Sequence, residues 1–185
     1  STWASYLVNG MYDHDGRSFW EDINRLPSGC FMTWSPGKDI HIEKWYDLVE
    51  RFRLFNYDLI GNVQETLESL LYDSVRLRFR SDVPVGICLS SGLDSSLLLG
   101  LIQKIQGNES CLNTFTFTCG DPSYDEDSAV GKLLSGTNHT PFFCRLTPSE
   151  VPELALAVQQ YQDEPFGGIP TLGMAKVHDK AREQG

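Results

Sequence analysis

The sequence predicts an α/β domain with a parallel sheet and helices on both faces. After Pro84, short runs of strand-forming residues alternate with helical patterns of ten or so residues, an order typical of βαβ units. The first of these strands leads through a serine-rich loop directly into a helix, which is the local geometry of an anion site. The residues before about position 48 have a different, aromatic-rich character.

The individual elements follow from local patterns. Strands are predicted at residues 85–89, 114–118 and 142–146, because these short runs are apolar or alternate β-formers. Helices are predicted at 95–106, 128–134, 150–160 and 172–183. A further helix at 57–79 is predicted from apolar residues spaced by three and four positions: Leu59, Val63, Leu67, Leu70, Leu71 and Val75.

In the first part of the chain we predict a helix at 2–9 that ends at Gly10, followed by a β-hairpin. Its strands are residues 30–34 and 40–45, which flank the turn 35–38. This segment is too small to form a self-sufficient domain. We interpret residues 1–48 as the end of a preceding domain and 49–56 as a linker. Residues 57–185 then belong to the α/β domain.

Composition excludes several classes of function. The chain has 185 residues and a net charge of 15 − 25 = −10, which argues against nucleic-acid and anionic-membrane partners. No apolar run approaches the roughly 18 residues of a membrane span. The start, Ser1-Thr2-Trp3-Ala4, lacks the pattern of a signal peptide, and the five scattered cysteines form no C-x-x-C pair. We therefore expect a cytoplasmic protein with reduced thiols.

The segment from Val85 to Leu98 carries the chemistry. A buried strand ends at Leu89, a loop of small residues follows, and a helix begins near Ser95. Such a junction directs free backbone N–H groups and the positive end of a helix dipole at one point, which suits a phosphate. Gly92 can adopt a positive φ at little cost, and four serine hydroxyls offer further donors: Ser90, Ser91, Ser95 and Ser96.

Asp94 would repel a phosphate, so its presence in this loop suggests a divalent cation between the two. A serine-rich cap on an ordinary core helix is the simpler interpretation. However, five small or hydroxylated residues with an aspartate exceed what a cap needs. The loop is also not the G-x-x-x-x-G-K-[ST] loop of common NTPases, since that pattern is absent from the sequence.

The loop Ser90-Ser91-Gly92-Leu93-Asp94-Ser95-Ser96 resembles the S-G-G-x-D-S signature of the N-type ATP pyrophosphatases (PP-loop proteins). The flanking sequence narrows the resemblance to the synthetase domain of the asparagine synthase (glutamine-hydrolysing) family. The flanks in question are residues 80–86, 115–118, 124–126, 137–139 and 163–166. Residues 19–34 are similar to the end of that family's N-terminal glutaminase domain. The chain therefore resembles a fragment that spans parts of two domains.

The resemblance implies an adenine nucleotide alpha hydrolase-like fold and an ATP-dependent ligase. Such an enzyme activates a carboxylate, such as aspartate, as an acyl-adenylate, releases pyrophosphate and amidates the product with ammonia from glutamine. It implies Mg²⁺ at Asp94 and ATP contacts from these residues: Leu89, Ser90, Ser91, Gly92, Leu93, Asp94, Ser95, Ser96 and Phe117. The family's general base is expected beyond Gly185, so no catalytic residue is assigned. A homodimer is an expectation for the full-length protein.

Other residues carry weaker expectations. Asp163 and Glu164 match the family's "D-E-P" segment and could face a metal or the substrate. Asp125 and Glu126 are expected to cap a helix, and His139 to be structural. Serine at position 91, where the signature has glycine, would be strained if φ there were positive.

Two alternatives to an asparagine synthase remain open. Related enzymes use the same ATP loop to amidate surface polysaccharide or to close β-lactams and lasso peptides. A non-catalytic nucleotide-binding module is the alternative of another class. The second loop that the family carries beyond Gly185 would distinguish these alternatives.

Overall fold

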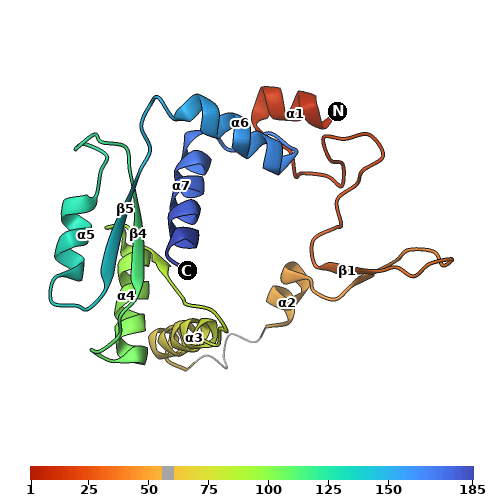
Figure 1. Cartoon of the computed structure of the whole chain (residues 1–185). Coiled ribbons are helices and arrows are strands. Elements are labelled where there is room, and N and C mark those ends of the chain that lie inside the picture. The colour runs from red at the N-terminus through yellow and green to blue at the C-terminus, as the bar shows by residue number, and fades with distance from the viewer. Residues whose placement is uncertain (56–60) are drawn as a thin grey trace. The chain divides into compact units, whose positions relative to one another are not determined.

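The computed structural model describes residues 1–55 and 61–185, which form two compact units, Ser1–Gly61 and Asn62–Gly185 (Figure 1). Residues 57–60 of the predicted 57–79 helix, and the last residue of the predicted linker, lie outside the described residues. The two units are taken in turn below, beginning with the larger one.

The Asn62–Gly185 unit is built on a parallel sheet of three strands in the order β3-β4-β5. The strands are β3 (Ile87–Cys88), β4 (Asn113–Thr118) and β5 (Thr140–Arg145). Cys88 lies opposite Phe115, and Phe115 lies opposite Phe142, with both pairings parallel. The predicted α/β class and the parallel sheet are therefore confirmed.

The side chains of β4 alternate between two cores. Thr114, Thr116 and Thr118 are all buried on one face, and Phe115 and Phe117 point to the other. On the threonine side, Leu89, which follows β3, packs with side chains of α4 (Leu93–Gln106) and α5 (Asp127–Leu134). This buried cluster consists of Leu89, Leu99, Val130 and Leu134.

The opposite face is covered by α7 (Ile169–Glu183). Val177 of α7 packs with Phe115 and Cys144, and Figure 1 shows α5 and α7 on opposite sides of β4 and β5. Helices thus cover both faces of the sheet, as predicted.

Helix α7 runs against the direction of the strands. Its early residue Gly173 lies against the ring of Phe117 near the end of β4, and Val177, one turn later, reaches Phe115. The start of α7 and the segment before it therefore lie at the carboxyl edge of the sheet, the edge from which α4 also departs.

Two further helices complete this unit. Helix α3 (Val63–Arg78) contributes Val75 to a cluster with Ile87, Leu101 and Ile102, and α6 (Val151–Gln162) packs on α7. The α3 helix begins later than predicted because the Asn62 side chain accepts hydrogen bonds from the N–H groups of Gln64 and Glu65, which caps the helix there.

The Ser1–Gly61 unit confirms the predicted first helix and hairpin. Helix α1 (Thr2–Asn9) ends at Gly10 with φ 67°, and β1 (Cys30–Thr33) pairs antiparallel with β2 (His41–Lys44). The predicted linker 49–56 contains most of α2 (Leu48–Leu54), which Asp47 caps by accepting from the N–H of Glu50. The cap explains why this segment is helical.

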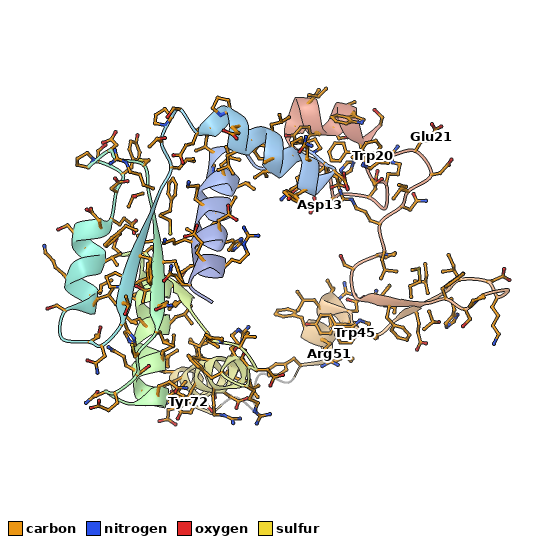
Figure 2. All side chains as sticks on the ribbon, viewed as in Figure 1. Asp13, Trp20, Glu21, Trp45, Arg51 and Tyr72 are labelled. Atoms are coloured by element: carbon orange, nitrogen blue, oxygen red, sulfur yellow. The ribbon has the colours of Figure 1, made fainter. Side chains whose placement is uncertain are left out.

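Several large aromatic side chains of the Ser1–Gly61 unit are exposed, among them Trp20 and Trp45 (Figure 2). Among its described residues the buried aromatic is Phe19, whose ring meets that of Trp3 edge-on with centroids 4.7 Å apart. Many large apolar side chains of this unit are thus exposed. Among the helices of the described residues, none is both long and apolar enough to cross a membrane.

Replacing Gly173 by Ala should destabilise the protein. A Cβ at this position would lie 3.0 Å from the Phe117 ring, so the ring must give way by a few tenths of an ångström. We expect this overpacking, at about 1–3 kcal/mol, to exceed the gain of about 0.5–1 kcal/mol that alanine brings to a helix. Gly131→Ala is the matched control, because a Cβ there meets nothing within 4 Å and alanine favours the helix by about 0.5–1 kcal/mol. Equal urea midpoints for the two variants would contradict the close packing of α7 on β4.

The ion pair between Glu150 and Lys176 predicts a pH-dependent contribution to stability. The Lys176 ammonium, 2.8 Å away, and the Thr147 hydroxyl lower the pKa of Glu150 from 4.5 to about 2. Since the folded pKa is the lower one, the carboxylate stabilises the fold above pH 4.5, and this stabilisation is lost as the pH falls toward 2.

Glu150→Gln should therefore lower the melting temperature by a few degrees at pH 7 and by progressively less between pH 4.5 and 3. Melting curves across this range test the prediction. Glu153→Gln, in the first turn of the same helix, is the control. A Glu150→Gln deficit that did not change with pH would show that the carboxylate charge is not the cause.

Candidate anion and nucleotide site

The serine-rich loop lies at the carboxyl edge of the sheet, between the end of β3 at Cys88 and the start of α4 at Leu93. The Ser95 hydroxyl closes it. This oxygen lies 2.8 Å from both the carbonyl oxygen and the hydroxyl of Ser90, and it accepts from the Ser90 N–H at 3.3 Å. One side chain from the first turn of α4 thus holds the end of the strand in place.

The other serines differ in their use. The Ser96 hydroxyl donates to the Gly92 carbonyl at 2.8 Å, and the Ser90 hydroxyl accepts from the Gly92 N–H at 3.2 Å. The sequence predicted that all four hydroxyls would be further donors to an anion. In the structure those of Ser90, Ser95 and Ser96 instead bond to the loop's own backbone, which fixes the turn between β3 and α4. Within the described residues, only Ser91 of the four has a hydroxyl without a partner.

The backbone of the loop is unstrained. Gly92 has φ −65° and ψ 156°, so the predicted use of a positive φ there is wrong. The positive-φ residues other than glycine in the described chain are Asp22 and Asp163, so serine at position 91 carries no such strain. Gly92 provides space instead, because a Cβ there would lie 3.2 Å from the Ser90 hydroxyl.

Helix α4 begins without a side-chain cap. Gly92 occupies the N-cap position, and no side chain of residues 1–55 or 61–185 accepts from the first-turn N–H groups, which belong to Leu93, Asp94 and Ser95. Leu93 and Asp94 are exposed. The uncapped amides and the positive end of the helix dipole make this point favourable for an anion.

The neighbouring β4–α5 loop reaches the site through Glu126. Its carboxylate accepts from the Ser91 N–H at 2.6 Å, although the residues are 35 positions apart. The sequence predicted that Asp125 and Glu126 would cap α5. That prediction is wrong for both side chains, because Glu126 at the N-cap makes no cap bond, and Asp125 turns back toward the end of β4.

Asp125 fixes the loop that carries Glu126. Its two carboxylate oxygens accept from the N–H groups of Cys119 and Gly120, each at 2.7 Å. The Cys119 bond is the main reason that the pKa of Asp125 is lowered. The ionised carboxylate therefore holds the first residues after β4 against the start of α5.

The remaining predicted site residues lie around this edge. The side chain of Leu89 is 3% exposed and belongs to the core, and its carbonyl accepts from the Thr116 hydroxyl. Phe117 is half-buried on the opposite face of the sheet, against Gly173. Asp163, with φ 56°, and Glu164 follow α6 on the segment that leads into α7, at the same edge.

The donor set fits Mg²⁺ only in company with phosphates. The described residues contain no group of three or more His, Cys, Asp or Glu side chains that could hold a metal. Mg²⁺ is commonly held by one or two carboxylates, several waters and the phosphates of a nucleotide. Asp94, exposed at the start of α4, can supply such a single ligand.

His139 is structural, as predicted. Its side chain is 7% exposed, and its Nδ1 atom accepts from the Leu112 N–H at 3.2 Å. Burial lowers the pKa of this imidazole, which favours the neutral form that the hydrogen bond requires.

A cavity of about 320 Å³ lies at the other end of the strands and does not belong to the loop. It is lined by Gly86, Asn113 and the end of α7. Since Asn113 is the first residue of β4, this cavity is at the amino edge of the sheet.

Fold and loop together define the Asn62–Gly185 unit as an α/β domain with a serine-rich strand-to-helix junction at the carboxyl edge of a parallel sheet. A family model described as asparagine synthase matches residues 66–185. The chain belongs to the asparagine synthase family.

Named relatives agree with this assignment. A protein of Methanocaldococcus jannaschii named asparagine synthetase (glutamine-hydrolysing) 2 is 36% identical over 77% of the chain and 27% of its own length. Asparagine synthetase B of Escherichia coli is 36% identical over 44% of the chain and 14% of its length. An amidase (chry2) of Gibberella zeae is 29% identical over 63% of the chain and 18% of its own length. The chain thus spans about a quarter of the length of the archaeal relative.

The hydrogen bonds of the loop predict that Ser95 contributes to the stability of the fold and that the Ser91 hydroxyl does not. Ser95→Ala removes the bonds to Ser90 and should cost about 1–2 kcal/mol, with faster hydrogen exchange at the Ser90 amide. Ser91→Ala removes a hydroxyl that has no partner in the described part of the chain and should change neither quantity. Chemical denaturation and exchange measured by NMR test both. Equal effects of the two substitutions would contradict the role of Ser95.

Proposed function

We propose that the Asn62–Gly185 unit is the ATP-binding part of an ATP-dependent, amide-forming ligase. The observation that carries the proposal is the uncapped start of α4, which follows the Ser90–Ser96 loop at the carboxyl edge of the sheet. Ligands of open α/β sheets bind at this edge. Membership of the asparagine synthase family supports ATP as the ligand, because the relatives include proteins named as glutamine-hydrolysing asparagine synthetases.

In the proposed mechanism the loop binds the β- and γ-phosphates, which leave together as pyrophosphate. The first-turn N–H groups of α4 donate to the phosphate oxygens, and Ser95 keeps the loop closed around them. These donors are fixed before the reaction, so they stabilise the charge that develops on the leaving group without reorganising. Mg²⁺, held by Asp94 together with the phosphates, would add further neutralisation of that charge.

The adenylate half of the reaction is the part that these residues can perform. Attack of a carboxylate oxygen on the α-phosphorus forms an acyl-adenylate and breaks the bond to pyrophosphate. Ammonia then displaces AMP and the amide forms. Asp163 and Glu164, on the segment before α7, are proposed to face the acceptor or the metal, and Leu89 and Phe117 to flank the nucleotide. Relatives named as asparagine synthetases and as amidases leave the acceptor carboxylate open.

We further propose that residues 1–48 are the end of a glutaminase domain that supplies the ammonia. Residues 66–185 make up 120 of the 185 residues, whereas the archaeal relative aligns over 77% of the chain. The similarity therefore extends into the residues before 66. The exposed aromatic surface of the Ser1–Gly61 unit supports its being part of a larger domain.

Binding of ATP tests the proposal. Calorimetric titration of Mg²⁺ATP into the chain should show saturable binding that Asp94→Ala and Ser95→Ala each weaken about tenfold or more. Asp94→Ala removes the proposed charged ligand of Mg²⁺, and Ser95→Ala removes the hydroxyl that keeps the loop closed. Glu109→Ala removes the same charge as Asp94→Ala beyond the other end of α4 and is the control. Asp94→Ala should lose the Mg²⁺ dependence as well. Full-strength binding by both loop variants would refute the assignment.

A further inference from the structure

The proposed anion site already contains an anion that belongs to the chain. The Glu126 carboxylate accepts from the Ser91 N–H at 2.6 Å, and Ser91 is an exposed member of the loop that we propose binds pyrophosphate. A backbone N–H has a single hydrogen to donate. A phosphate oxygen that binds at Ser91 must therefore take the place of this carboxylate oxygen.

The position of Glu126 is held by the fold. Asp125, the residue before Glu126, accepts hydrogen bonds from the N–H groups of Cys119 and Gly120. In the same loop, Asp121 accepts from the N–H and hydroxyl of Ser123. Glu126 itself is half-buried, and at the N-cap of α5 its carboxylate bonds to Ser91 and not to its own helix. The contact is thus a defined link between the two crossovers of the sheet.

A charge argument gives the direction of the effect. Glu126 and Asp94 are both carboxylates at this loop, and within the described residues neither is paired with a lysine or arginine. A polyphosphate that approaches Ser91 meets a negative charge at contact distance. The ligand must displace the carboxylate from the amide, or a cation must compensate the two like charges.

Resting on the proposed function, we infer that Glu126 is an internal competitor for the anion site. In the free protein its carboxylate occupies the Ser91 amide, and it moves away when pyrophosphate or the β,γ-phosphates of ATP bind. Part of the requirement for Mg²⁺ then comes from Glu126, because the cation offsets the repulsion between this carboxylate and the ligand.

The test is the affinity of the chain for inorganic pyrophosphate, by calorimetry, with and without Mg²⁺. Glu126→Gln keeps the size of the side chain and removes its charge. Glu126→Asp keeps the charge and shortens the reach to Ser91. The matched control is Asp127→Asn, which removes the same charge one residue further along, from an exposed side chain in the first turn of α5. Thermal melts establish that each variant is folded.

We expect Glu126→Gln to bind pyrophosphate about tenfold more tightly than the unaltered chain without Mg²⁺, the size of effect of one charged hydrogen bond. The gain should be smaller with Mg²⁺, and Asp127→Asn should show little of it. Glu126→Asp should gain less than Glu126→Gln, because it keeps the repelling charge. The Ser91 amide should exchange faster in Glu126→Gln without ligand, since a neutral acceptor holds it less strongly.

Three results would overturn the inference. Unchanged affinity in Glu126→Gln would show that the carboxylate does not compete. Weaker binding that appears only with Mg²⁺ would make Glu126 a metal ligand. Equal gains in pyrophosphate affinity in Glu126→Gln and Asp127→Asn would show that the effect comes from the net charge of the chain and not from the Ser91 contact. Failure of the proposed function looks different, since then neither the unaltered chain nor any Glu126 variant binds pyrophosphate or ATP, with or without Mg²⁺.

Discussion

The pairing of β4 with a strand on each side is the interaction on which the rest of the Asn62–Gly185 unit depends. Because β4 is hydrogen-bonded to both β3 and β5, its alternating side chains separate two cores, with threonines toward α4 and α5 and phenylalanines toward α7. Its parallel register also brings the ends of the strands to one edge. The serine-rich loop, the β4–α5 loop and the start of α7 meet there for this reason.

At that edge the polar groups of the loop satisfy one another. The loop amides of Ser90, Ser91 and Gly92 bond to the side chains of Ser95, Glu126 and Ser90. The amides at the start of α4 are left without a side-chain acceptor. An ordered loop with a few open donors loses little entropy when an anion binds, which is the physical advantage of preorganisation.

The local elements of this fold could be predicted because they depend on neighbouring residues. Apolar spacing predicted the body of α3, alternation of β-formers predicted β4, and Gly10 marked the end of α1. The serine-rich loop was predicted for the same reason, since a strand, a run of small residues and a helix follow each other directly. The α2 helix was missed because most of its residues fall in 49–56, the segment interpreted as a linker, and the cap at Asp47 just before it was not recognised.

Sequence alone therefore determined the α/β class, the order of the elements apart from α2, and the loop with Asp94 as the candidate anion and cation site. Only the tertiary structure decided which distant groups reach that loop. The bond from Glu126 to the Ser91 amide joins residues 35 positions apart, and the role of Asp125 depends on how the chain turns after β4. No periodicity encodes such contacts, because they arise when the register of parallel strands places two crossovers side by side.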